Sequence, residues 1–151
     1  MSSFIQINRE TTIPTGTIRF IRPIGNDERA RIKERYGADA AAFNVSIQFG
    51  DKSTKLAVET IDQLREQGVS LVDIGGDRHV VAANIKSTKP FSAKDAAKIE
   101  ERGYNISQDF KSRVETTAGA VLTSATPAQI MDRRARAQNG GNQPAPQPAN
   151  G

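Results

Sequence analysis

Apolar and polar residues alternate most regularly in the segment FNVSIQF, residues 43–49. In an extended chain its Phe, Val and Ile side chains lie on one face and its Asn, Ser and Gln side chains on the other, so the segment predicts a half-buried strand. Shorter alternating runs at 4–7 and 17–22 predict two more strands. Because the connection between them contains Pro14 and Gly16, we expect these two strands to pair as a hairpin with a long loop.

The pattern changes to a helical period after residue 50. Apolar positions three and four residues apart predict a helix between positions 53 and 68, where a glycine is placed as the C-terminal cap. The apolar run 69–74 follows, so the chain from 43–49 to 69–74 predicts a strand–helix–strand crossover with parallel strands. The segment 79–85 is then predicted to return as an antiparallel strand.

Four other segments predict helices. Residues 26–37 begin with Asn as N-cap and end at Gly, and residues 92–103 begin with a Ser-x-x-Asp capping box. Residues 110–122 place apolar side chains at helical spacing, and residues 126–138 begin with Thr-Pro followed by Gln at the third helical position. These elements predict an α+β fold with a mixed sheet of about five strands, containing an N-terminal hairpin, one crossover and a second hairpin, followed by C-terminal helices.

The composition changes near Gln138. Residues 139–151 contain no charge, no aromatic residue and no aliphatic side chain larger than Ala, which predicts a disordered tail. We therefore expect an α+β core at 1–125, a basic helical extension at 126–138 and the tail at 139–151. No internal repeat of useful length is visible in the sequence.

Charge and cysteine content narrow the function classes. The chain has 151 residues and a net charge of +4, but only three of its basic and one of its acidic residues follow residue 125, so the core is nearly neutral. The absence of cysteine excludes disulfides, thiolate zinc sites and cysteine nucleophiles, and makes the cytoplasm the expected location. No signal peptide and no apolar run of the ~20 residues that span a membrane are recognisable, so no membrane partner is expected.

The segment FGDKSTK has some features of a phosphate-binding loop. A Walker loop requires Gly immediately before its Lys, whereas Asp51 precedes Lys52 here. A carboxylate at that position would repel phosphate. The segment therefore favours a turn, and no nucleotide or other cofactor is expected.

Asp73, Asp77 and His79 are the densest group of possible metal ligands, and they surround the Gly75–Gly76 turn. The alternative is that Asp77 is an ordinary turn residue and that Asp73 and His79 are neighbours across two strands. His79 is the single histidine, and the chain has no G-x-S-x-G motif, which argues against hydrolase chemistry. A small metal-dependent enzyme or a metal-binding protein that uses these three residues is the alternative function.

The distribution of basic residues indicates the favoured function. Arg133, Arg134 and Arg136 precede the predicted tail, and Arg19, Arg22, Lys86 and Lys89 form a possible second patch. Such side chains can neutralise phosphates or meet an acidic protein surface. The sequence thus predicts a non-enzymatic binding or assembly module whose basic C-terminus contacts nucleic acid, RNA or single-stranded DNA, or an acidic protein partner. We also expect a homo-oligomer, because the two hairpins leave an exposed sheet edge.

Overall fold

The computed structural model describes residues 3–37, 42–103 and 110–140, and it confirms the α+β class. Most of the predicted tail, residues 141–151, lies outside the described residues. Its first two residues belong to helix α4, which continues to Gly140. The elements follow one another in this order: β1 (Phe4–Ile7), β2 (Thr11–Pro14), the 3-10 helix η1 (Thr15–Thr17), β3 (Ile18–Pro23), α1 (Asn26–Tyr36), β4 (Val45–Phe49), β5 (Thr54–Ala57), α2 (Ile61–Glu66), β6 (Leu71–Gly75), β7 (Arg78–Val81), the 3-10 helix η3 (Ala82–Asn84), β8 (Ile85–Pro90), α3 (Ala93–Glu101), β9 (Ser112–Thr116), β10 (Gly119–Thr123) and α4 (Pro127–Gly140).

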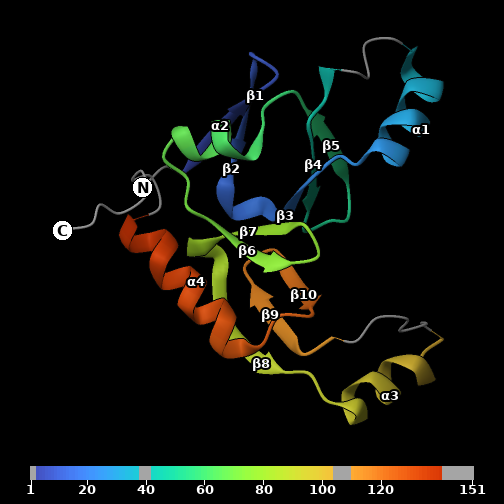
Figure 1. Ribbon diagram of the computed structural model, residues 1–151, viewed down its shortest axis with the longest axis vertical. Coiled ribbons are helices and arrows are strands. Elements are labelled where there is room, and N and C mark those ends of the chain that lie inside the picture. Colours follow the sequence, from blue (N-terminus) through green and yellow to red (C-terminus); the bar gives the residue numbers. More distant parts are fainter. Residues whose placement is uncertain (1–2, 38–41, 104–109, 141–151) are drawn as a thin grey trace.

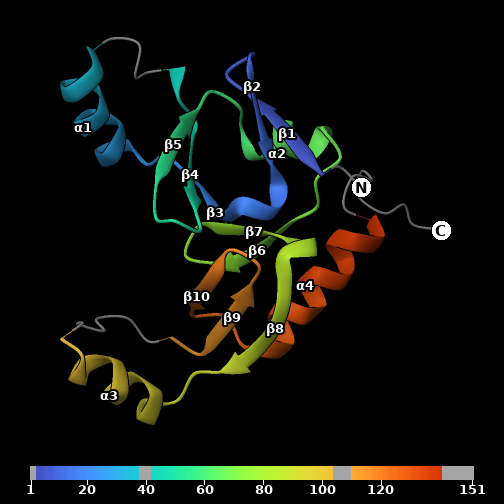
Figure 2. The same ribbon diagram turned by 180° about the vertical axis from the view of Figure 1, so that it is seen from behind.

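This order is a tandem repeat. The first repeat runs from β1 to α2 and the second from β6 to α4, and both consist of a hairpin, a 3-10 turn, a long strand, a helix, a second hairpin and a final helix. The elements from β6 to β9 each begin 67 residues after their counterparts in the first repeat. Figures 1 and 2 show the first repeat in the upper part of the molecule and the second below it.

Each repeat has its own hydrophobic core. The first core gathers Ile5, Ile7, Ile13, Ile18, Ile47 and Leu64. The second core gathers the residues at the equivalent positions: Val72, Ile74, Val80, Ile85, Val114 and Ile130. Only some of these pairs are identical residues, because any β-branched or aliphatic side chain of similar volume fills such a position. The repeat therefore lies in the pattern of burial more than in residue identity.

Three sheets connect these elements, and every strand pair in the described residues is antiparallel. The largest sheet has the order β5–β4–β3–β7–β6 and so joins the two repeats through the β3–β7 contact. The strands β10–β9–β8 form a second sheet, and β1 pairs with β2 alone. A hydrogen bond from Thr117 Oγ1 to the carbonyl of Gly16 and two from Asn84 Nδ2 add further contacts between the repeats.

The predicted parallel crossover is wrong. Residues 54–57 form β5, an antiparallel partner of β4, and the helix that follows begins only at Ile61. The turn between β4 and β5 is closed by Asp51, which accepts hydrogen bonds from the main chain and hydroxyl of Ser53. The N-terminal hairpin also differs from expectation, because β1 pairs with residues 11–14, and the strand at 18–23 joins the large sheet.

The helix predicted over 110–122 is also wrong. Two strands occupy this region, with Ser112, Val114 and Thr116 facing inward and Gly119, with φ of 118°, as the first residue of β10 directly after the turn. A short apolar run fits a period of two as well as a period near four, and the β-branched residues here favour the strand. The helices predicted at 26–37, 92–103 and 126–138 are confirmed as α1, α3 and α4, although the N-cap of α1 is Gly25.

Two helices stand away from the body. Neither α1 nor α3 has a buried residue, and both project outward at the same side of the molecule in Figure 1. In contrast, α4 packs against β6, β8 and η3 and places Ile130 in the second core with no exposed surface. Residues 126–138, which the sequence separated from the core as an extension, thus contribute to that core. Within the described residues no helix is both long enough and apolar enough to cross a membrane.

Candidate functional site

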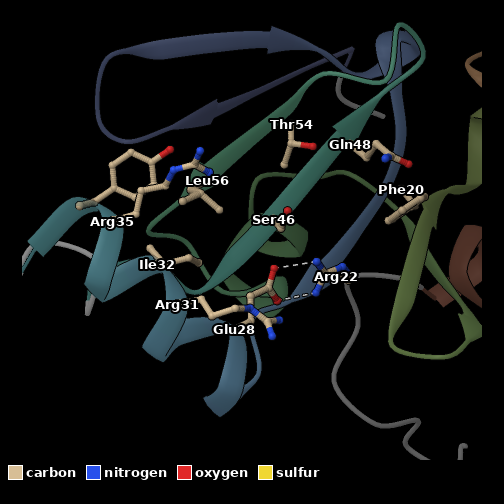
Figure 3. Close-up of a pocket in the computed structure, with 11 residues that line it drawn as sticks. Phe20, Arg22, Glu28, Arg31, Ile32, Arg35, Ser46, Gln48, Thr54 and Leu56 are labelled. Carbon is tan, nitrogen blue, oxygen red and sulfur yellow. Dashed lines mark hydrogen bonds and ion pairs between the residues drawn. The ribbon is translucent and has the colours of Figure 1, made fainter.

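A groove of about 490 Å³ lies between α1 and the outer face of strands β3, β4 and β5 (Figure 3). The alternation of β4 builds its floor, because Val45 and Ile47 face the first core while Ser46 and Gln48 face the groove. Residues from both sides line it: Phe20, Arg22, Glu28, Arg31, Ile32, Arg35, Tyr36, Ser46, Gln48, Thr54 and Leu56. The floor residues on β4 and β5 are uncharged, and Ser46, Gln48 and Thr54 can donate and accept hydrogen bonds.

An ion pair fixes α1 to the sheet. The two terminal nitrogens of Arg22 reach the two carboxylate oxygens of Glu28 at 2.5 and 2.7 Å, a bidentate arrangement drawn in Figure 3. This hydrogen bonding lowers the pKa of Glu28 and raises that of Arg22. The pair holds the first turn of a helix that buries no residue of its own.

Two further guanidinium groups give the groove its charge. Arg31 and Arg35 are one helical turn apart on the same face of α1, and both line the groove. No ion pair of either residue occurs within the described part of the chain. Because Glu28 already neutralises Arg22, the net positive charge of the lining comes from Arg31 and Arg35.

A second group of arginines surrounds Phe20 at one end of the groove. The guanidinium carbons of Arg19 and Arg78 lie 5.7 and 5.1 Å from the centre of the Phe20 ring. Arg19 donates to the carbonyl of Ala120 and to Gln48 Oε1, and Arg78 donates to the carbonyl of Leu122. These partners are neutral, so the positive charge of both groups remains. Burial, and then the charges of Arg19 and Arg22, lower the pKa of Arg78.

The groove continues past Tyr36. A neighbouring cavity of about 480 Å³ shares Tyr36, Thr54 and Leu56 with it and adds Lys55. The side chain of Tyr36 is 59% exposed and stands where the two cavities meet. The combined surface offers Arg31 and Arg35 along α1, a polar floor, the exposed ring of Tyr36 and the partly buried ring of Phe43.

The predicted patch of four basic residues is divided between the repeats. Arg22 lines the groove, and Arg19 contacts its floor residue Gln48. Lys86 and Lys89 occupy the same two positions on β8 and do not line this groove. The four residues are thus related by the tandem repeat, a relationship that the sequence did not reveal.

The three C-terminal arginines lie on α4, and each has a partner. Arg133 donates to the carbonyl of Asp73 at 2.9 Å, as Gln67 at the end of the first repeat donates to the carbonyl of Gln6 at 2.8 Å. Arg134 donates to the carbonyl of Ala82, and Arg136 pairs with Asp132 one turn earlier. Arg133 and Arg136 also border, with Arg65, a smaller hollow of about 270 Å³. This helix is held on the body instead of extending freely from it.

Asp73 and His79 lie opposite each other on β6 and β7, as the alternative interpretation of that segment expected. Asp73 accepts a hydrogen bond from the main chain of Gly75, and Asp77, with φ of 62°, is in the turn. Among the residues described, no three His, Cys, Asp or Glu side chains lie close enough to hold a metal ion. The buried Nδ1 of His79 has no hydrogen-bond partner among these described residues, and burial lowers the pKa of this imidazole.

Comparison with known proteins gives no relative: no family model, no curated protein and no solved structure matches the chain. The functional argument therefore depends on the groove. Its lining residues Arg31, Arg35 and Tyr36 were not among the predicted site residues, and neither was Arg78, which lies over the Phe20 ring at its end. The i, i+4 spacing of Arg31 and Arg35 on a correctly predicted helix was the signal that could have indicated the first two.

Proposed function

We propose that this protein is a non-enzymatic binding module that holds single-stranded nucleic acid in the groove between α1 and strands β3–β5. The observation that supports this best is the combination of Arg31 and Arg35 on one wall, an uncharged floor and the exposed ring of Tyr36. Proteins that bind single strands combine a cationic groove for the phosphates with aromatic rings on which bases stack.

The geometry favours a single strand over a duplex. A duplex-reading protein places a helix or a strand pair in a groove of the DNA, whereas here the protein itself is concave. Because α1 buries no residue, it can adjust to a strand lying between it and the sheet, while the Arg22–Glu28 ion pair keeps its first turn in place. Ser46, Gln48 and Thr54 can then hydrogen-bond to base edges or sugars.

The internal repeat gives independent support. Four basic positions of the first repeat are basic again in the second, although most surface positions differ: Arg19 and Lys86, Arg22 and Lys89, Arg31 and Lys98, Arg35 and Arg102. Three of the four residues in the first repeat line the groove, and the fourth contacts its floor. Retention of charge at these positions is expected if both repeats contact a polyanion.

Binding of labelled dT20 and U20 measured by fluorescence anisotropy at several salt concentrations tests the proposal. We expect affinity to fall steeply with salt, and each of Arg31→Gln and Arg35→Gln to reduce the slope of log affinity against log salt by about 0.7, the value for one phosphate contact on a single strand. Lys33→Gln is the matched control, because Lys33 is exposed on the same helix but does not line the groove.

Three outcomes would overturn the proposal. These are equal effects of Arg31→Gln and Lys33→Gln, absence of binding at low salt, and binding of polyglutamate with the same affinity as dT20. The last result would indicate an acidic protein as the partner instead. A duplex of the same length should bind more weakly than dT20.

The arginines of α4 are a second candidate contact for the same strand. The observation that favours them is the hollow bordered by Arg65, Arg133 and Arg136. Deleting residues 126–151 is not a clean test, because it removes Ile130 from the second core. Arg136→Gln, at an exposed position, tests this contact without that loss, and a change in the salt slope equal to that of Lys33→Gln would exclude it.

A further inference from the structure

The hairpin of the second repeat is enclosed on both faces. Val72, Ile74 and Val80 on one face of β6 and β7 belong to the second core, and Leu71 and Val81 on the other face belong to the first. Strand β7 also joins the large sheet, with His79 opposite Ile21 of β3. The second repeat thus completes the core of the first through this hairpin.

The equivalent hairpin of the first repeat is covered on one face only. Ile5, Ile7 and Ile13 of β1 and β2 lie in the first core. On the outer face, Phe4 is 56% exposed, whereas Leu71 at the equivalent position is 2% exposed. Pro14 is exposed as well, whereas its counterpart Val81 is buried.

The main chain of β2 also presents an edge. The main-chain N–H and C=O of Gln6 both bond to the side chain of Gln67, on the side of β1 away from β2. Residues opposite each other in an antiparallel pair either exchange both hydrogen bonds or neither, so Gln6 and its opposite residue Thr12 exchange none. The N–H and C=O of Thr12 therefore point away from β1. They face the side on which the equivalent strand β7 meets β3.

The second repeat carries the matching strand edge, on β8. Strand β8 is the counterpart of β3 and pairs with β9 as β3 pairs with β4. Where β3 has β7 on its other side, β8 pairs with no second strand among the described residues. In Figure 2 the hairpin of β1 and β2 is at the top and β8 lies in the lower half, so the two surfaces do not meet within one chain.

We propose that the outer edge of β2 in one copy of this chain adds to the outer edge of β8 in a second copy, in the register that the β3–β7 contact displays. In this register Thr12 of one copy lies opposite Thr88 of the other. These two residues are the counterparts of His79 and Ile21, which lie opposite each other inside the chain. Facing threonines are a favourable pair on a sheet. The partner is a second copy because every chain carries both a β2 edge and a β8 edge. These two edges are the counterparts of the β7 and β3 edges that pair inside the chain.

This contact joins two different surfaces. Contacts of this kind close into a ring or continue as a chain of copies. Thr88 replaces the fully buried Ile21, and Lys86 and Lys89 lie beside it, so the contact between copies is more polar than the internal one and association is reversible.

The absence of cysteine allows a direct test of the register. Opposite residues in a hydrogen-bonded antiparallel pair have Cα atoms about 5.5 Å apart, within the range of a disulfide. Single variants Thr12→Cys and Thr88→Cys are mixed at equal concentration and mildly oxidised. We expect the mixed disulfide in at least a fivefold excess over that formed when Thr17→Cys, at an exposed position on η1, replaces Thr12→Cys.

A second measurement follows association without a crosslink. Light scattering of the full chain across a range of concentrations should give a mass that rises above that of the monomer. Phe4→Asp should shift this rise to at least tenfold higher concentration, whereas Met131→Asp, a change at another exposed apolar residue, should not. A monomer at every concentration, equal crosslinking of the two mixtures, or equal effects of the two Asp variants would each overturn the proposal.

Discussion

Asn84 and Thr17 occupy the same position in the two repeats, as the last residues of η3 and η1, but only Asn84 reaches the other repeat. Its Nδ2 donates to the carbonyls of Thr15 and Ile18 at 2.8 and 3.1 Å, and the side chain is buried. The hydroxyl of Thr17 instead bonds locally to the carbonyl of Pro14. One polar side chain thus bridges two similar repeats.

We expect Asn84→Ala to destabilise the protein by about 2–3 kcal/mol, because two carbonyls in the buried contact lose their donor. Thr17→Ala is the matched control and should cost less than about 0.5 kcal/mol, since it removes an exposed local hydrogen bond. Urea unfolding monitored by circular dichroism measures both values. Equal losses in the two variants would show that Asn84 does not hold the repeats together.

The turns of the two central hairpins meet at Gly50. A Cβ added there would lie 2.9 Å from the carbonyl oxygen of Ala118, which is main chain and cannot rotate away. Gly50→Ala should therefore force the β4–β5 and β9–β10 turns apart and cost about 1–3 kcal/mol.

Gly16 provides the control for this substitution, because a Cβ there meets no atom of the described part of the chain within 4 Å. Thermal unfolding should show a clearly lower midpoint for Gly50→Ala and a change of less than about 2 °C for Gly16→Ala. A similar midpoint for both variants would contradict the close approach of the two turns.

His79 should make stability depend on pH. Burial lowers the pKa of its imidazole in the folded protein, while the unfolded chain keeps the ordinary value of about 6.5. Below that value the unfolded chain takes up a proton that the folded protein resists, so the free energy of unfolding should decrease as the pH falls from about 7 towards 5.5.

The variant His79→Gln separates this imidazole from other titrating groups. It should show a flatter dependence of the free energy of unfolding on pH across the same interval, measured by urea unfolding at each pH. Carboxylates titrate mainly below this interval and contribute to both proteins alike. Parallel curves for the two proteins would mean that the imidazole is not buried in its neutral form.

The sequence by itself determined the elements whose signals are local. The capping boxes of α3 and α4 are formed by residues three positions apart, so Ser92 with Asp95 and Thr126 with Gln129 could be identified without knowledge of the rest of the chain. The strict alternation of apolar and polar residues around Ile47 predicted β4, because this alternation is also a local signal and indicates which face of the strand is buried.

Tertiary structure decided which segments pair and which side chains meet. The apolar residues of 110–122 satisfy a helical period, and only pairing with β8 made this region a hairpin. Glu28 with Arg22, and Phe20 between Arg19 and Arg78, come together because α1 folds back over β3 and because the second repeat adds its hairpin to the first. The repeat itself escaped the sequence because burial constrains the size and polarity of a side chain and leaves its identity free to change.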